Sequence, residues 1–146
     1  MSSQADSIFG QDIKLDDGGQ ALVAANGELV MTQGVETGSQ DIRVRLFTPL
    51  GTLFYDQDFG SLVHEWVKEE NTLAARMAFC AEVARRVRLD QRVQYGSEAC
   101  SILSWDETGI KAAVSWQFID EDSVFNLVIE TNEDMELVIK DVNPGQ

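Results

Sequence analysis

Cysteine, histidine and proline are scarce in this sequence. Its 146 residues contain two cysteines, two prolines and one histidine. Cys80 and Cys100 belong to no Cys-x-x-Cys or His-x-x-x-His spacing, so the pattern typical of zinc sites is missing. We expect both thiols to be reduced and to pack as small apolar side chains. A glycine-rich phosphate-binding motif is also absent, and we expect no metal and no cofactor.

Basic residues are few as well. Lys and Arg total 11 against 25 Asp and Glu, which gives a net charge of −14. Residues 1–40 carry six acidic residues and one basic, residues 41–95 carry eight of each, and residues 96–146 carry eleven acidic and two basic. Because nucleic-acid binding depends on neutralising phosphates, we expect no nucleic-acid partner. Only the middle segment has arginines available for the carboxylates of a partner protein.

Long apolar runs are missing. No stretch approaches the roughly 18 apolar residues that cross a bilayer, and the N-terminus lacks the basic start and apolar stretch of a signal peptide. We therefore expect no membrane insertion and no export from the cytoplasm. A hydrophobic content of 44% instead indicates a folded core. The expected organisation is a flexible N-terminus over residues 1–11 and a single domain over residues 12–146.

The N-terminal third predicts a β-hairpin. Two short apolar runs flank Asn26-Gly27, the dipeptide preferred in two-residue type I′ turns because both turn positions need a positive φ. In that register, the face that we expect to be buried consists of Leu22, Ala24, Leu29 and Met31.

The middle of the chain predicts helices. Residues 35–47 fit two structures, because apolar residues alternate with basic ones over 42–46 as in a strand, while Val35, Ile42 and Leu46 also fit a helix. The alternation alone slightly favours the strand. A short helix is expected from Gly60, and a long helix over residues 71–89 with Asn71 as its N-cap. The expected apolar positions of the long helix are Leu73, Met77, Cys80, Ala84 and Val87.

After Arg92 the hydrophobic period changes to two. Strand-like runs are separated by acidic turns, which predicts an antiparallel meander with one packed face. In the second run, the inward-facing residues are Ile110, Ala112, Val114, Trp116 and Phe118. Trp105 and Trp116 lie on this sheet, where core positions are favoured over interface positions. The predicted fold class is α+β, with an N-terminal β-hairpin, two to three helices in the middle and a C-terminal antiparallel β-sheet.

One stretch combines the groups that a glycan hydrolase uses. Residues 48–71, TPLGTLFYDQDFGSLVHEWVKEEN, hold several aromatic side chains and five carboxylates: Asp56, Asp58, Glu65, Glu69 and Glu70. Hydrolysis needs one carboxylic acid in an apolar pocket and a second carboxyl group about 5 to 9.5 Å away. These carboxylates also have ordinary roles in a turn and beside a helix start. No nucleophile and orienting group can be assigned to His64. The sequence therefore favours a non-enzymatic protein.

The same stretch resembles the signature of a contractile-tail baseplate family. That family includes phage baseplate protein W, the wedge sheath-initiator proteins and the corresponding subunit of type VI secretion systems, and it was long labelled lysozyme-like. The resemblance spans roughly residues 12–141. It implies that the proline and glycines of the stretch set turns and that its aromatic residues pin the loop to the neighbouring helices. The residues that match the family signature are Thr48, Pro49, Gly51, Phe54, Tyr55, Asp56, Asp58, Gly60, Glu70 and Asn71.

The resemblance also implies a helix over about residues 35–47 and a contact with other baseplate proteins. Many family members carry Glu-Pro-Arg after the long helix, and the aligned residues here are Asp90, Gln91 and Arg92. The acid is shorter and the proline is replaced, so only Arg92 carries over directly. An arginine fork can hold a carboxylate or several carbonyl oxygens. The residues predicted to bind the wedge core are Arg92, Asp90, Arg43 and Arg45. The alternative is that Arg92 only neutralises charges at the helix end.

By resemblance, the chain is a structural subunit of a contractile-tail baseplate, present in sixfold copies. It would join the wedge core and offer its C-terminal sheet to the first ring of tail sheath by strand addition. The implied partners are other baseplate wedge proteins and the tail sheath protein, with the tail tube or hub as further candidates. The implied location is the virion, in the tail baseplate, after assembly in the host cytoplasm. The alternative function is a peptidoglycan-degrading, lysozyme-like tail enzyme.

Overall fold

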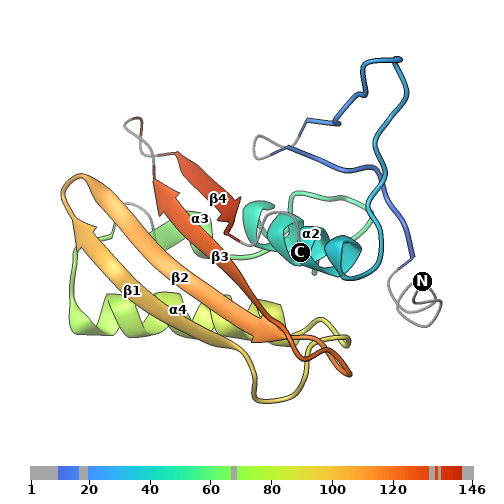
Figure 1. Cartoon of the computed structure of the whole chain (residues 1–146). Helices are drawn as coiled ribbons and strands as arrows, with labels where there is room; N and C mark the ends of the chain where they lie inside the picture. Colours follow the sequence, from blue (N-terminus) through green and yellow to red (C-terminus); the bar gives the residue numbers. More distant parts are fainter. Residues whose placement is uncertain (1–9, 17–19, 67–68, 132–133, 135, 143–146) are drawn as a thin grey trace.

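A computed structural model describes residues 10–16, 20–66, 69–131, 134 and 136–142 of the chain. The elements in chain order are α2 (Val35–Phe47), α3 (Val63–Trp66), α4 (Leu73–Arg88), β1 (Ala99–Asp106), β2 (Gly109–Gln117), β3 (Val124–Thr131) and β4 (Leu137–Asp141) (Figure 1). The strands form one antiparallel sheet in the order β1-β2-β3-β4. The predicted α+β class is confirmed. No helix in the described part of the chain is long and apolar enough to span a membrane.

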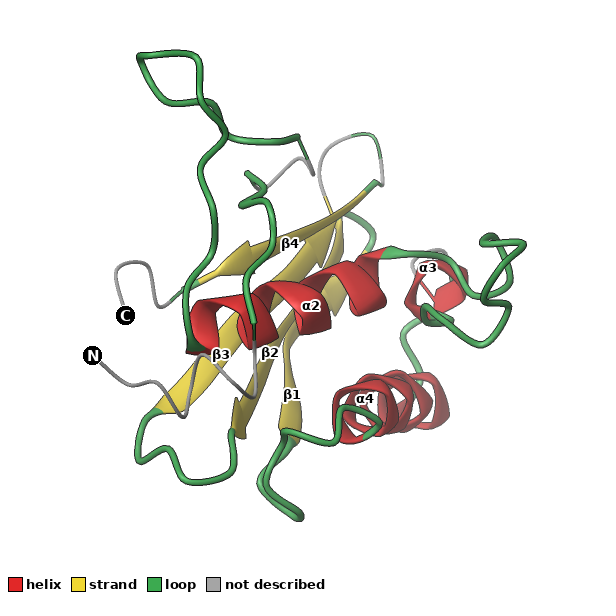
Figure 2. Ribbon diagram, turned by 90° about the vertical axis from the view of Figure 1, so that its right-hand side faces the viewer, coloured by secondary structure: helices red, strands yellow, loops and turns green. Residues whose placement is uncertain are grey.

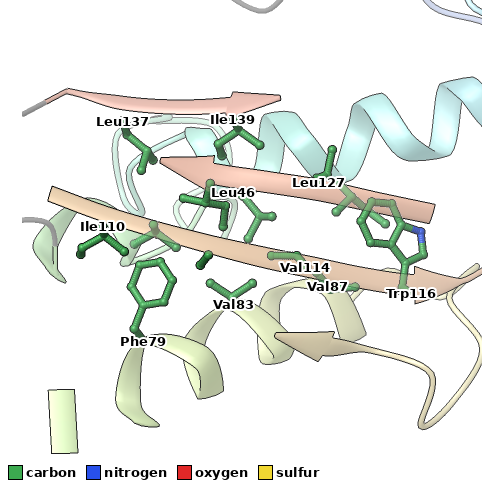
Figure 3. Close-up of a cluster of buried hydrophobic side chains, with 14 of the residues drawn as sticks. Leu46, Phe79, Val83, Val87, Ile110, Val114, Trp116, Leu127, Leu137 and Ile139 are labelled. Carbon is green, nitrogen blue, oxygen red and sulfur yellow. The ribbon is translucent and has the colours of Figure 1, made fainter. Parts of the chain in front are cut away.

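The helices pack on one face of the sheet. α4 lies along β1 and β2, whereas α2 contacts β4 (Figures 1 and 2). Side chains from both helices and from the inner face of the sheet form a single core, part of which Figure 3 shows. The inward-facing set predicted for β2 and the residue that follows it is confirmed: Ile110, Ala112, Val114, Trp116 and Phe118 are at most 3% exposed. Trp105 is also buried, so both tryptophans of the sheet are core residues.

Residues 35–47 form a helix, as the family resemblance implies, and the slight preference for a strand is wrong. Its buried side explains why hydrophobic periodicity is a poor guide here. Besides Ile42 and Leu46, that side includes the small or polar residues Thr37, Gly38, Ser39 and Gln40.

The long helix turns a partly different face to the core than the apolar pattern predicts. Of the predicted positions, Val87 is buried and Cys80 and Ala84 are half-buried, but Leu73 and Met77 are 67% and 65% exposed. Phe79 instead points to the sheet and meets Trp105 edge to face, with ring centroids 5.8 Å apart. Two apolar stripes run along this helix, and the stripe with the aromatic ring is the buried one. The buried residues of α4 are Ala75, Phe79, Glu82, Val83, Arg86 and Val87.

The start of α4 also differs from the prediction. Thr72 is the N-cap, because its hydroxyl oxygen accepts a hydrogen bond from the amide of Ala75 at 3.0 Å. The Asn71 side chain points elsewhere and donates to the carbonyl of Trp105 at 2.7 Å. The Trp105 indole also donates to the carbonyl of Glu69, two residues before Asn71, at 3.2 Å. Asn71 therefore ties the helix start to β1 instead of capping the helix.

The N-terminal hairpin has a different turn from the predicted one. Ala25, Asn26 and Gly27 all lie in the turn, since the amide of Ala24 donates to the carbonyl of Glu28 at 2.8 Å. Gly27 takes a φ of 88°, while Asn26 is outside the positive-φ region. A three-residue turn with glycine last uses the same Asn-Gly dipeptide but shifts the register by one residue, which places Leu22 and Ala24 on the face opposite Leu29 and Met31.

The predicted buried face of the hairpin is consequently wrong except at Leu22, which is half-buried. Val23 pairs with Leu29, and the two are 59% and 50% exposed. Met31 is 42% exposed, and Ala24 is exposed as well. We call residues 10–32, without the undescribed 17–19, the N-terminal arm; Figure 1 shows it in blue, extending away from the layers. Residues 1–9 of the predicted flexible N-terminus lie outside the described residues.

The two cysteines lie against the core as half-buried free thiols. Burial raises the pKa of the Cys100 thiol, and its contact with the Cys80 thiol raises it further. Both effects favour the protonated, unreactive form.

Candidate partner-binding site

Arg92 lies just beyond the end of α4, where the backbone is held on two sides. The amide of Asp90 donates to the carbonyl of Val87, and the amide of Val93 donates to the carbonyl of Asp90, each at 3.1 Å. The carbonyl of Arg92 accepts from the amide of Ile119 at 2.8 Å, next to the bridge between Val93 and Phe118. The residue is thus fixed between the end of α4 and the end of β2.

The Arg92 side chain connects α4 to α2. Its Nε donates to Asp90 Oδ1 at 2.9 Å, and its Nη2 donates to Asp90 Oδ2 at 2.6 Å. The same Nη2 donates to Asp41 Oδ2 at 3.0 Å. The side chain of Asp90 is 6% exposed and that of Asp41 is 40% exposed. The buried carboxylate of Asp90 therefore binds the guanidinium through two of its nitrogens, and the partly exposed carboxylate of Asp41 binds it from α2.

The two carboxylates respond differently to this position. Burial by itself raises the pKa of Asp90, but the hydrogen bonds from Arg92 outweigh it and the pKa is lowered. Burial raises the pKa of Asp41, and the single hydrogen bond from Arg92 only partly offsets it. The hydrogen bonds to Asp90 raise the pKa of Arg92 above its ordinary value. Asp90 is the strong partner of Arg92, and Asp41 is the weak one.

A cavity of about 570 Å³ opens beside Arg92. Arg92, Arg45, Gln40, Asp41 and Asp12 supply its charged and polar groups. Its apolar lining comes from the N-terminal arm, α2 and residue 59: Ile13, Leu15, Ala21, Val44 and Phe59. The Arg45 guanidinium lies over the Phe59 ring, 5.0 Å from its centroid. We call this cavity the Arg92 pocket.

The N-terminal arm forms one wall of the pocket through polar contacts. Gln40 Nε2 donates to the carbonyl of Ile13 and Gln40 Oε1 accepts from the amide of Leu15, each at 2.8 Å. Arg43 Nη2 donates to the carbonyls of Leu15 and Asp16 at 3.1 and 3.3 Å. The side-chain amide of Gln40 thus forms the two hydrogen bonds with the arm backbone that a neighbouring strand would form.

The four residues predicted to bind a partner are close together but have different roles. Arg45 and Arg92 line the pocket. Asp90 holds Arg92, and Arg43 holds the arm. Sequence reasoning missed Gln40, Asp41 and Phe59, which complete the site. Phe59 lies inside the family signature, but nothing in the sequence links Asp41 to a residue 51 positions away.

The signature stretch forms the connection from α2 to α3. Thr48 closes α2, since its hydroxyl donates to the carbonyl of Val44 at 2.7 Å. Pro49 forms a parallel bridge with Ser61. Gly60 has a φ of 116°, and a Cβ there would lie 2.5 Å from the carbonyl oxygen of Thr48. Gly51 likewise takes a φ of 84°. These residues shape the turns, as the resemblance implies.

The acidic residues of this stretch do not form an enclosed acid–base pair. Asp56, Asp58, Glu65, Glu69 and Glu70 are all exposed, whereas a general acid needs an apolar pocket. His64 is half-buried, its Nε2 contacts the carbonyl of Phe47, and its ring packs edge to face on the Phe47 ring. The geometry gives the hydrolase hypothesis no support.

The fold is shared with a protein of known structure. It is similar to that of a chain in the cryo-EM structure of the anti-feeding prophage (AFP) baseplate, 6-fold symmetrised. The match has a TM-score of 0.57 and covers 90% of this chain and 91% of that chain, at 14% sequence identity. Comparisons with models of protein families and with curated proteins give no match. The likeness therefore establishes a common fold, and the signature over residues 48–71 stays a prediction about the family.

Proposed function

We propose that this chain is a structural subunit of the baseplate of a contractile tail. The observation that carries the proposal is the fold likeness to the AFP baseplate chain, which covers nearly the whole of both chains. The signature over residues 48–71 supports it independently, because the signature rests on residue identities alone. The exposed carboxylates of that stretch favour this role over a peptidoglycan-degrading enzyme.

We further propose that the Arg92 pocket attaches the chain to other baseplate proteins of the wedge. Asp90 keeps the guanidinium oriented, while the weaker, half-exposed Asp41 is the contact that a partner's carboxylate or carbonyl can replace. Arg45 and the apolar lining can receive the remainder of the partner's side chain. On this view, Arg92 neutralises its acidic neighbours and also presents a guanidinium that binds the partner in the pocket.

The C-terminal sheet is the proposed attachment site for tail sheath. β1 and β4 are the outer strands, and an outer strand can accept an extended arm through main-chain hydrogen bonds. β1 has a register shift between Ile102 and Ser104. A photoreactive residue at Leu103 in β1 or at Lys140 in β4, both exposed, would report which edge contacts a purified sheath protein.

The decisive experiment is deletion of the gene followed by complementation. We expect the deletion to abolish complete tails in electron micrographs, and the chain to be present in purified wild-type particles in sixfold copies. Arg92→Lys keeps the charge but loses the fork, so it should restore fewer tails than Arg85→Lys, a change at an exposed arginine of α4 outside the pocket. Tails that form normally without the chain would contradict the proposal.

The enzyme hypothesis is tested with a variant that carries Asp56→Asn, Asp58→Asn, Glu69→Gln and Glu70→Gln together. We expect the purified wild-type chain to leave peptidoglycan intact and the variant to behave alike. Normal tail assembly together with loss of peptidoglycan clearing in the variant would overturn the structural proposal.

A further inference from the structure

The most exposed neighbouring aromatic residues lie in the signature loop between α2 and α3. Phe54 is 87% exposed and Tyr55 is 74% exposed. Their rings meet edge to face, with centroids 5.4 Å apart. The resemblance implies that such rings pin the loop to the helices, and for Phe54 and Tyr55 this expectation is wrong. Figure 2 shows the loop at the edge of the molecule beside α3.

The base of this loop is closed by hydrogen bonds. The amide of Ser61 donates to the carbonyl of Thr48 at 2.9 Å, and the amide of Leu50 donates to the carbonyl of Ser61 at 3.0 Å. The buried Ser61 hydroxyl donates to the carbonyl of Leu46 at 2.6 Å. Within the loop, the amide of Asp56 donates to the carbonyl of Leu53 at 3.1 Å. A loop fixed in this way presents its two rings with little backbone conformational entropy left to lose on binding.

The sequence around the two rings is acidic. Asp56 and Asp58 follow them in the loop, and Glu65 lies on α3; all three are exposed. From Leu46 to Val67 the sequence contains no lysine and no arginine. A partner surface that matches this loop must therefore combine an apolar pocket with a basic rim.

We propose that Phe54 and Tyr55 insert together into an apolar pocket of another protein whose rim carries lysine or arginine. Adjacent aromatic side chains on a fixed backbone are typical of the residues that dominate binding at protein interfaces. The acidic residues beside them would steer the encounter and exclude acidic surfaces. A second copy of this chain is the less favourable occupant, because each copy carries a net charge of −14. The inference uses the proposed function only to suggest that the partner is another tail protein.

The first experiment identifies the partner. A photoreactive phenylalanine replaces Phe54 in the full chain, expressed at its natural level in the organism that produces it, and crosslinked peptides are mapped by mass spectrometry. The matched control places the same residue at Tyr95, an aromatic side chain that is 91% exposed in a different turn. We expect position 54 to capture one protein, at apolar residues flanked by Lys or Arg, and position 95 not to capture it.

The second experiment measures affinity for the captured protein in purified form. The double change Phe54→Ala and Tyr55→Ala should weaken binding about 30-fold or more, whereas Tyr95→Ala should change it less than about threefold. Asp56→Asn with Asp58→Asn should slow association and reduce its dependence on salt. Because all these side chains are exposed, the melting temperatures of the variants should match that of the wild type.

Several outcomes overturn this inference while leaving the proposed function intact. They are capture of a second copy of the chain, capture of an acidic surface, no capture at position 54 in cells that form tails, or equal affinity of the double variant. If the captured protein has an apolar pocket with a basic rim but is not a tail protein, the inference stands and the proposed baseplate function fails.

Discussion

The core and the N-terminal arm are held by different forces. In the core, Trp116, Phe79 and Phe118 are fully buried, and the sheet and helices share one apolar interior. In the arm, Thr32 is the one buried residue among those described, and Val23 and Leu29 are exposed. The contacts that hold the arm on α2 are mainly hydrogen bonds to its backbone, from Gln40 and Arg43 among others.

This difference sets how each region opens. A buried large apolar side chain contributes about 1.5–3 kcal/mol, whereas a neutral hydrogen bond contributes about 0.5–1.5 kcal/mol. The core should therefore open only in global unfolding, and the arm should detach locally at a smaller free energy. Because the arm forms one wall of the Arg92 pocket, local detachment changes the proposed binding site without unfolding the domain.

The largest effect is expected for Phe79→Ala. The change removes a fully buried ring that packs on Trp105, so it should lower the free energy of unfolding by about 3–5 kcal/mol in urea titrations. Met77→Ala on the same helix, at a side chain 65% exposed, should change it by less than about 0.5 kcal/mol. Equal effects of the two changes would contradict the observed orientation of α4.

The next largest loss of unfolding free energy is expected when the ion pair of the core is broken, and breaking the ion pair of the arm should cost less. Glu82 accepts from Arg86 Nε and from the amide of Leu62, each at 2.7 Å, and both side chains are nearly buried. Glu82→Ala leaves that arginine uncompensated and should cost about 3 kcal/mol of unfolding free energy. The arm pair, Lys14 with Glu36, is partly exposed, so Glu36→Ala should cost less than about 1 kcal/mol. The same urea titrations measure both, and a similar loss in the two variants would remove the distinction between the regions.

The core was predictable from the sequence where one face of an element is apolar without interruption. The alternation from Ile110 to Phe118 gave the inner face of the sheet correctly. Periodicity failed for α2, because the buried side of that helix contains Thr37 and Gln40, whose hydrogen bonds have no signature in hydropathy. It failed for α4 because two apolar stripes compete, and only the packing of Phe79 on the sheet decides between them.

The candidate site was predictable only in part. The resemblance singled out Arg92, Asp90, Arg43 and Arg45 as partner-binding residues, which stays a prediction, and it could not distinguish residues that line the pocket from those that hold its walls. The exposure of Phe54 was also beyond the sequence, because an aromatic residue in a loop is as compatible with the core as with the surface.

The stability that Arg92 provides by linking α4 to α2 should depend on pH. The pKa of Asp90 is lowered in the fold, so its stabilising contribution is present above the unfolded pKa and is lost as the pH falls through the folded pKa. Asp90→Asn should therefore cost about 1.5–3 kcal/mol at pH 7 and less near pH 3. The pKa of Asp41 is raised, so ionisation of that group opposes folding as the pH rises, and Asp41→Asn should cost less at pH 7. Urea titrations of the three proteins at both pH values measure these differences; a cost for Asp90→Asn that does not change with pH would contradict them.

The smallest global effect is expected for Gln40→Ala, and it tests the comparison most directly. The side-chain amide of Gln40 supplies both hydrogen bonds to Ile13 and Leu15, so its loss should release the arm and leave the apolar core intact. Hydrogen exchange should show the Leu15 amide at least about tenfold less protected, with global stability reduced by about 1 kcal/mol or less. Gln33→Ala, at an exposed residue, is the matched control and should leave Leu15 unchanged. If amides of β3 lose protection as much as Leu15 does, the arm and the core unfold as one unit, and the pocket wall cannot move independently of the domain.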